Sequence, residues 1–252
     1  MIRLYHWEAH GACARVMFCL AEKGLDYESR YVDPLAFEQH KPELIALNPT
    51  GQLPILDDAG FVCVEATDIC DYLEEAYPAV ALMPEAVVDR WRVRVWQKHV
   101  DEYVAASIGQ LAWQQARTTM FAGRDTAALE AAVAAIADKG RRDWWKLSLV
   151  PYPDDQLDRA RERLVPILVA AEEALAHADW LVGSFSLADI ALYAYLAFLP
   201  EVAADLLADR PAIAAWIGRV AARPAVRTAS ARGTAARPFA VAAPGQEEMR
   251  WG

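Results

Sequence analysis

The chain has 252 residues, of which 55% are apolar and 24% are charged, and its formal net charge is −10. This length suits two domains of ordinary size, and the composition is that of a soluble globular protein. The acidic balance argues against an extended nucleic-acid surface, because phosphate contacts need a basic field.

The first 78 residues alternate strand and helix signals. The patterns predict, in chain order, a strand at 2–6, a helix at 14–23 capped by Gly24, a strand at 27–32 and a weaker helix at 37–47. A short strand that begins at Pro54, a hairpin through 57–60, a strand at 61–64 and a helix that Pro78 ends follow. This β-α-β-α-β-β-α order predicts a thioredoxin-like domain over residues 1–78. Residues 78–84 are expected to be a linker.

From residue 85 onward only helical periods appear, which predicts an all-helical domain over residues 85–227. The expected helices are 87–116, 126–147, 154–177, one starting at Leu187 and one starting at Ala212. Ser186 and Asp189 have the spacing of a capping box, so we interpret Asp189 as a folding determinant rather than a site residue. Residues 228–252 are rich in Ala, Arg, Pro and Gly, which favours a tail that is disordered or laid over the surface.

The most informative segment is Asn48-Pro49-Thr50-Gly51-Gln52-Leu53-Pro54-Ile55-Leu56, followed by Glu65-Ala66-Thr67-Asp68-Ile69. Proline rarely opens a buried strand, because it cannot donate to the ladder. We expect Pro54 to be cis and Leu53 to offer its N–H and C=O at the sheet edge, where an extended peptide can pair with them.

These residues resemble the glutathione transferase superfamily, whose thioredoxin-like half carries an Asn-Pro-x-Gly-x-Val-Pro-x-Leu run and then a Glu-Ser pair. The resemblance covers nearly the whole chain. It implies that Gln52, Leu53 and Pro54 hold the cysteinyl part of glutathione and that Glu65 binds its γ-glutamyl end. Ala66 stands where the family usually has serine, so the γ-glutamyl carboxylate must take the N–H of Ala66, Thr67 or the helix start.

The same resemblance assigns Gln39 and His40 to the glycyl carboxylate of glutathione. His40 could donate to that carboxylate whether neutral or charged, although a solvated helix face explains the two residues equally well.

The loop from Trp7 to Cys13 is predicted to carry the chemistry. Cys13 lies near the start of the first helix, where unpaired N–H groups and the dipole favour a thiolate and lower the thiol pKa. Gly11-Ala12-Cys13 is similar to the active-site loop of bacterial cysteine-type transferases, which implies a catalytic role for Cys13. Two alternatives remain: Cys13 packs under the ligand without bonding to it, or Tyr5 supplies the activating hydroxyl.

No metal site is expected. His6, His10 and Cys13 are close in sequence, but no fourth ligand stands at a typical zinc spacing. Cys19, Cys63 and Cys70 are interpreted as small core residues, and Val16 stands where a resolving thiol would be. Four cysteines without Cys-x-x-Cys spacing fit a reducing compartment. The absence of a signal-peptide pattern or a long apolar segment adds to an expected cytoplasmic location.

Aromatic residues recur along the helical half, in a band formed by Trp91, Trp96, Tyr103, Trp113 and Phe121, joined by Trp144 and Trp145. Most are expected in the core. A few should line a cleft between the domains, since the family builds its electrophile pocket there, and we assign Trp7, Tyr103 and Trp113 to that pocket.

A narrower resemblance links the chain to bacterial glutathione-dependent β-etherases, which cleave aryl ethers derived from lignin. It rests on Val32-Asp33-Pro34, Phe37-Glu38-Gln39-His40, Arg94-Val95-Trp96, Val100-Asp101-Glu102-Tyr103, Ala135-Ile136, Trp180-Leu181-Val182 and Leu187-Ala188-Asp189-Ile190. In that family a glutathione thiolate attacks the carbon that bears the aryl ether, beside a ketone, and a phenolate leaves. The β-etherase pattern has Asn-Ser where this chain has Ala12-Cys13.

The sequence therefore predicts a two-domain glutathione transferase, forming a homodimer, that adds the glutathione thiolate to a hydrophobic, aromatic electrophile. Three alternatives remain open. A glutathione-dependent thiol transferase would use Cys13 as its nucleophile, a scaffold of the same fold would not need Cys13, and a passive carrier of aromatic ligands would need the cleft without turnover.

Overall fold

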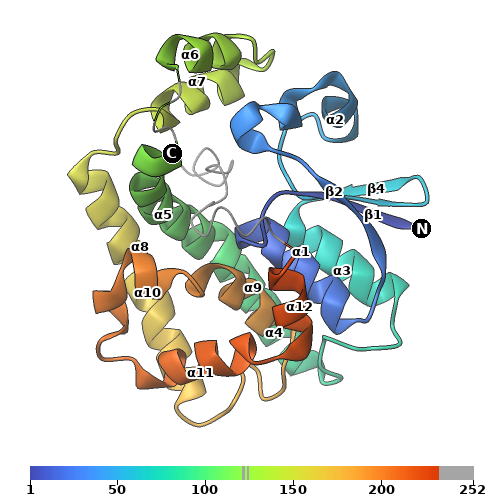
Figure 1. The fold of residues 1–252 in the computed structure, drawn as a ribbon. Helices are drawn as coiled ribbons and strands as arrows, with labels where there is room; N and C mark the ends of the chain where they lie inside the picture. The colour runs from blue at the N-terminus through green and yellow to red at the C-terminus, as the bar shows by residue number, and fades with distance from the viewer. Residues whose placement is uncertain (121–122, 124, 233–252) are drawn as a thin grey trace.

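The computed structural model describes residues 1–120, 123 and 125–232, and the account below concerns these residues. Its first part is a small mixed sheet covered by helices (Figure 1). The strands are β1 (Ile2–His6), β2 (Tyr27–Tyr31), β3 (Ile55–Asp58) and β4 (Phe61–Val64), in the order β2-β1-β3-β4. β1 pairs parallel with β2, whereas β1–β3 and β3–β4 are antiparallel.

Helices α1 (Gly11–Glu22) and α3 (Ala66–Ala76) pack on one side of this sheet, and α2 (Pro42–Leu47) lies on the other (Figure 1). The predicted thioredoxin-like arrangement is confirmed. Apolar side chains of β1 and α1 explain the packing, since Leu4, Val16 and Leu20 are fully buried between the sheet and the helices.

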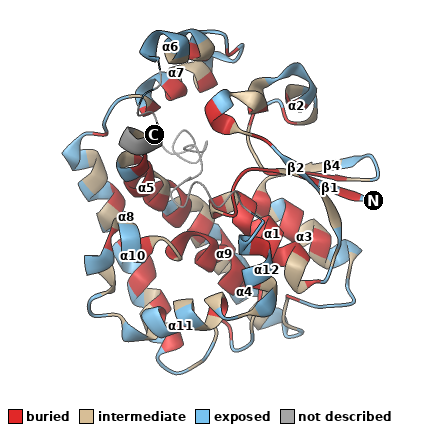
Figure 2. Cartoon of the chain, viewed as in Figure 1, coloured by how far each residue is buried: buried red, intermediate tan, exposed pale blue. Residues whose placement is uncertain are grey.

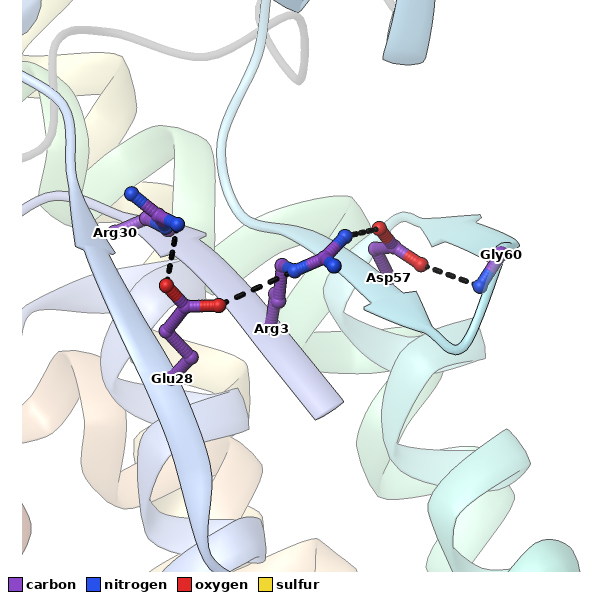
Figure 3. Close-up of polar contacts among 5 residues, drawn as sticks. All are labelled: Arg3, Glu28, Arg30, Asp57 and Gly60. Carbon is purple, nitrogen blue, oxygen red and sulfur yellow. Dashed lines mark hydrogen bonds and ion pairs between the residues drawn. The ribbon is translucent and has the colours of Figure 1, made fainter. Parts of the chain in front are cut away.

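A ladder of charges crosses the sheet near its outer end (Figure 3). The register places Arg3 on β1 between Glu28 on β2 and Asp57 on β3, and the guanidinium bonds to both, at 3.2 and 2.7 Å. Asp57 also accepts the N–H of Gly60 at 2.8 Å, in the β3–β4 turn. Opposite charges at directly facing positions favour this register over a slipped one.

The second part of the chain is entirely helical among the described residues. Its elements are α4 (Val87–His99), a π-helical segment (Val100–Val104), α5 (Ala105–Met120), α6 (Thr126–Ala134), α7 (Lys139–Ser148), α8 (Asp154–Leu175), α9 (Leu187–Leu196), α10 (Leu199–Val202), a short 3-10 turn (Ala204–Leu207), α11 (Pro211–Ala221) and α12 (Pro224–Ser230). Helix α9 lies at the centre, and every one of its residues is buried (Figure 2).

The start of α9 is fixed by a buried carboxylate. The capping box of Ser186 and Asp189 is present. Asp189 also accepts the N–H of Leu181 at 3.1 Å and the indole N–H of Trp216, on α11, at 2.9 Å. The predicted capping box is therefore confirmed, and the same carboxylate joins α9 to α11.

The two parts of the chain share packed surfaces. Helix α1 lies against α9 and α12, and Arg223, just before α12, forms a bidentate ion pair with Glu22 at 2.6 and 2.7 Å. A second hydrophobic cluster joins parts of both domains. It joins the first loop to α6 and α7 and consists of Trp7, Cys13, Leu35, Trp113, Val133, Ile136, Trp144, Trp145 and Tyr152.

Several expected helices differ from the observed ones for local reasons. Helix α1 begins at Gly11, three residues before the expected start. The expected helix over 37–47 is a 3-10 turn, Glu38–His40, followed by α2, because Pro42 holds the residue before it in an extended conformation; another 3-10 turn, Pro34–Ala36, precedes it.

The two longest expected helices are interrupted. The helix expected over 87–116 contains the π-helical segment and extends to Met120. The helix expected over 126–147 is divided into α6 and α7, because Asp138 caps a new helix by accepting the N–H of Arg141. Helix α12 extends into the expected tail, to Ser230, and residues 233–252 of that tail lie outside the described residues.

Candidate active site

A cleft of about 270 Å³ opens between the sheet domain and the helical domain. One wall comes from the loop before α1, the Asn48–Pro54 loop and the start of α3. The other wall comes from the π-helical segment, α5, α7, α9 and Phe198. The predicted residues that line the cleft are Trp7, Cys13, Gln39, Gln52, Leu53, Pro54, Glu65, Ala66 and Thr67.

Leu53 presents an open backbone edge at this wall. The peptide bond between Leu53 and Pro54 is cis, as predicted. Neither the N–H nor the C=O of Leu53 has a hydrogen-bond partner among the described residues. The loop before it is fixed by Asn48, whose side-chain amide donates to the carbonyl of Gln52 at 3.0 Å. A donor and an acceptor are thus held ready for an extended peptide.

The start of α3 forms the acidic end of the cleft. Glu65 is the N-cap and has φ +68°, a left-handed conformation that glutamate rarely adopts. Residues held in such regions cluster at ligand sites, where the surrounding structure offsets a strain of about 1–3 kcal/mol. The carboxylates of Glu65 and Asp68 suit a cationic amine, and the N–H groups that follow Glu65 suit a carboxylate.

The hydroxyl of Thr67 is already engaged across the cleft. It donates to Asp101, in the π-helical segment, at 2.5 Å. Asp101 also pairs with the buried Arg15 of α1 at 2.6 Å. Of the alternatives that the sequence left for the γ-glutamyl carboxylate, the Thr67 hydroxyl is therefore the least available, and the backbone N–H groups of Ala66 and Thr67 fit better.

Cys13 lies in the first turn of α1 with 5% of its surface exposed. Its Sγ accepts the backbone N–H of Trp7 at 3.5 Å. Burial raises the pKa of the Cys13 thiol to about 12, and the nearby Glu8 carboxylate adds to the rise. The expectation of a lowered pKa is wrong for this geometry. The cost of desolvating the thiolate is larger than the stabilisation that the thiolate gains from the Trp7 hydrogen bond.

The two residues expected at the glycyl end behave differently. Gln39 is buried and lines the cleft, with its Nε2 donating to the carbonyl of Pro34 at 3.4 Å. His40 does not line the cleft but packs behind Gly51, where an added Cβ would lie 2.8 Å from the imidazole. Burial and the nearby Arg141 charge lower the pKa of His40 to about 4, so its ring is neutral at pH 7.

Two of the three residues expected in the electrophile pocket lie elsewhere. Trp113 is fully buried in the second cluster, where its Nε1 donates to the carbonyl of Ser148 at 2.8 Å. Tyr103 is 42% exposed and does not line the cleft. Helical period alone cannot distinguish a cleft-facing ring from a core or solvent-facing ring. Phe121, from the same band, lies outside the described residues.

The aromatic rings at the cleft instead come from Trp7, Tyr195 and Phe198. The ring of Phe198 lies against the imidazole of His10, with 4.4 Å between centroids. Trp7 is 3% exposed, and its indole Nε1 has no hydrogen-bond partner among the described residues. The cleft therefore offers flat apolar surface together with a buried N–H donor, which suits an aromatic ligand with a polar group.

Sequence reasoning missed the residues that reach the cleft from the helical domain, above all Asp101, Arg141, Tyr195 and Phe198. One local signal existed for Arg141. Asp138 has the position of an N-cap, which starts a new helix and brings Arg141 into its first turn. No comparable signal marks Asp101, whose position depends on the π-helical segment.

Among the described residues, no group of three or more His, Cys, Asp or Glu side chains could hold a metal ion. His6 is engaged elsewhere, since its two ring nitrogens contact the carbonyl of Trp7 and the hydroxyl of Ser29. None of the described helices is long and apolar enough to cross a membrane.

Both halves of the chain match known protein families. The family model of the glutathione S-transferase N-terminal domain matches residues 4–81, and that of the C-terminal domain matches residues 130–224. Protein LigF of Sphingobium sp. (strain NBRC 103272 / SYK-6) is 30% identical over 90% of this chain and 91% of its own length. Glutathione S-transferase F14 of Arabidopsis thaliana is 30% identical over 83% of this chain and 75% of its own length.

Solved structures agree with the sequence matches. The crystal structure of β-etherase LigF from Sphingobium sp. strain SYK-6 has a TM-score of 0.85 and 29% identity, covering 92% of this chain and 99% of that one. Glutathione transferase F7 from Populus trichocarpa has a TM-score of 0.72 at 24% identity and shares the fold, over 92% of this chain and 98% of that one. The chain therefore belongs to the glutathione S-transferase family, and glutathione is its co-substrate.

Proposed function

We propose that this transferase cleaves an aromatic ether beside a ketone. Glutathione lies along the Leu53 edge with its γ-glutamyl end at Glu65 and its thiolate near Cys13. The observation that carries the proposal is the meeting of the open Leu53 backbone, Glu65, Cys13 and an aromatic wall in one cleft. The 30% identity to LigF, a β-etherase of known structure, supports this choice of electrophile.

Cys13 acts as a donor in this proposal. With its pKa raised to about 12, the thiol keeps its proton at neutral pH. Its Sγ accepts the N–H of Trp7, which leaves the S–H group able to donate into the cleft. A donor beside the glutathione sulfur favours the thiolate of the co-substrate over its thiol. Cys13 thus orients and stabilises the nucleophile without attacking the substrate.

The reaction needs little further chemistry from the protein. The glutathione sulfur attacks the carbon next to the ketone, a C–S bond forms, and the C–O bond breaks with its electron pair on the phenolate oxygen. The phenolate then takes a proton from water. The indole N–H of Trp7 is a candidate donor to the ketone oxygen, because it is buried at the cleft without another partner. Positioning supplies most of the rate.

The thiol-transferase alternative receives less support. A nucleophilic cysteine must be a thiolate, and the burial that raises the pKa of Cys13 disfavours the thiolate at neutral pH. Val16 follows Cys13 by three residues, so no resolving thiol stands at that spacing.

The experiment measures two activities in wild type and Cys13→Ser. One is release of the phenol from a β-aryl ether ketone in the presence of glutathione, and the other is reduction of a glutathione mixed disulfide. We expect phenol release in both proteins, with substantial activity retained by the serine variant, because a hydroxyl also donates. Loss of both activities in Cys13→Ser, together with a glutathione adduct on Cys13 in wild type, would contradict the proposal.

We also infer a homodimer with twofold symmetry. The large apolar side chains that are more than half exposed include Phe61 on β4, at 53%, and Val87, Val88 and Trp91 on α4, at 71%, 59% and 61%. Phe61 lies on the thioredoxin-like domain and the other three lie on the helical domain, as expected if each domain packs on the opposite domain of a partner. Light scattering should give about twice the chain mass of 27.9 kDa, and the monomer mass at micromolar concentration would contradict a dimer.

The cytoplasm remains the proposed location. All four cysteines are free thiols, which supports a reducing compartment. A cell-fractionation experiment that recovers the protein outside the cytoplasm would contradict this location.

A further inference from the structure

Helix α7 brings a buried arginine from the helical domain into the cleft. Arg141 is 4% exposed and lies in the first turn of α7, where its N–H is bonded to the Asp138 cap at 2.7 Å. Its Nη2 donates to the carbonyl of Gly51 at 3.4 Å, and its guanidinium carbon lies 5.1 Å from the ring centroid of Trp144. The side chain is thus held by α7 on one side and by the loop leading to Leu53 on the other.

Packed aromatic rings lie next to this arginine on α7. Trp145, the next aromatic residue on α7, is fully buried and lies against the ring of Phe37, with 4.9 Å between centroids. Phe37 belongs to the segment that carries Gln39. Helix α7 and the Gln39 segment are therefore packed together, and Figure 1 shows α7 on the same side of the sheet as α2.

The charged residues that line the cleft are acidic at one end and cationic at the other. Glu65, Asp68 and Asp101 lie at the α3 end. Arg141 is the only lysine or arginine among the described residues that line the cleft. Near it, Gln39 is 3% exposed, and its Oε1 has no hydrogen donor among the described residues. His40, which the sequence assigned to a carboxylate, is neutral and outside the cleft.

We propose that Arg141 binds the glycyl carboxylate of glutathione and makes the enzyme selective for a co-substrate that carries this charge. The assignment rests on the proposed placement of glutathione along Leu53. It matches the polarity of the cleft, because the γ-glutamyl ammonium then lies at the acidic end and the glycyl carboxylate at the cationic end. A guanidinium fork fits the two oxygens of a carboxylate, and exclusion of water strengthens the bond.

The test compares glutathione with glutathione esterified at its glycyl carboxylate, using an aryl ether ketone that carries no carboxylate. In wild type, the KM for glutathione should be about tenfold or more below the KM for the ester, the range for a hydrogen bond between charged groups. In Arg141→Met this difference should vanish, with the KM for glutathione raised to that for the ester and kcat little changed.

The control is Lys146→Met, which removes one positive charge from an exposed position of the same helix. It should keep the wild-type preference. Arg141→Gln, a second neutral variant with a polar end, tests the same point if the methionine variant does not fold.

Two results would overturn the assignment: a preference for glutathione that persists in the neutral Arg141 variants, or equal KM values for glutathione and its ester in wild type. Wild type that binds neither glutathione nor its ester would overturn the proposed function as well. Equal binding of both would overturn only the role of Arg141.

Discussion

The two walls of the cleft hold their ligand groups in different ways. The thioredoxin-like wall offers mainly backbone: the N–H and C=O of Leu53 and the first N–H groups of α3, held by the loop bonds of Asn48 and by the left-handed Glu65. The helical wall offers side chains that come from separate helices, namely Asp101, Arg141 and Tyr195.

This difference predicts how each wall responds to change. A backbone wall keeps its binding groups when a side chain is replaced, provided that the local fold persists. A wall of side chains gains or loses a binding group with a single substitution, and its geometry depends on how the helices behind it are packed. Five variants test this comparison, beginning with the largest expected effect and ending with the smallest.

The largest effect is expected at Asp189, which supports the helical wall without touching the cleft. Asp189→Ala leaves buried donors of Leu181, Ser186 and Trp216 without their acceptor. The free energy of unfolding should fall by about 3–5 kcal/mol, measured by urea denaturation.

Asp155→Ala is the matched control, since Asp155 is an exposed residue of α8 whose carboxylate pairs with Arg159 one turn along the same helix. It should change the unfolding free energy by less than about 0.5 kcal/mol. An Asp189→Ala protein as stable as this control would show that the α9 cap does not support the helical wall.

The next effect is expected at Glu65, the charged group of the thioredoxin-like wall. Glu65→Ala should weaken glutathione binding by about 1.5–3 kcal/mol, because a bond to the ammonium of the γ-glutamyl group is lost. Isothermal titration calorimetry measures this change, with Glu75→Ala as control, an exposed acid on the same helix. Unchanged affinity would remove Glu65 from the site.

Glu65→Gly separates the side chain from its backbone. The glycine variant should bind glutathione as weakly as the alanine variant, because both lack the carboxylate. Glycine adopts φ +68° freely, so its free energy of unfolding should exceed that of the alanine variant by about 0.5–1 kcal/mol. A glycine variant less stable than the alanine variant would mean that the positive φ of residue 65 carries no strain that glycine relieves.

A pH dependence follows from Asp189. Burial raises the pKa of this carboxyl to about 6, above its unfolded value near 3.8. The native state therefore binds a proton at Asp189 more tightly than the unfolded state does. Protonation of Asp189 adds to the free energy of unfolding as pH falls through 6, and this gain is complete below pH 3.8. Asp189→Asn lacks this group, so the stability advantage of wild type over the variant should grow by about 2 kcal/mol between pH 7 and pH 4.

Urea denaturation of both proteins across this pH range measures the difference directly. The comparison cancels the other titrating groups, since both chains carry them. An advantage that shrinks as pH falls would mean that Asp189 is ionised in the native state and held by its donors.

The two walls also differ in how far the sequence predicted them. The Leu53–Pro54 edge and Glu65 come from a short contiguous segment, where local rules on proline, turns and helix starts decide the structure. The helical wall depends on distant contacts. Trp113 and Tyr103 have the period of a helix face, but the packing of α5 against α8 and the π-helical segment decided where each ring points.

Cys13 illustrates the same limit inside a well-predicted loop. Its position at the start of α1 was readable, and the helix start alone would lower the thiol pKa. The burial that raises that pKa comes partly from the second cluster. Three of its members, Trp113, Trp144 and Trp145, lie about one hundred positions or more from Cys13 in the sequence. A local motif therefore predicts the place of a group better than its protonation state.

The smallest effect is expected at Leu53, and it tests the backbone wall most directly. Its side chain is half-buried and packs at the edge of the second cluster, while its N–H and C=O face the cleft without partners among the described residues. Leu53→Ala keeps both backbone groups, so the KM for glutathione should change by less than about threefold, or about 0.6 kcal/mol. Arg141→Met, on the opposite wall, should change the same constant by about tenfold or more. If Leu53→Ala weakens glutathione binding as much as Arg141→Met, at unchanged stability, then the leucine side chain is itself a binding group and the two walls do not differ in kind.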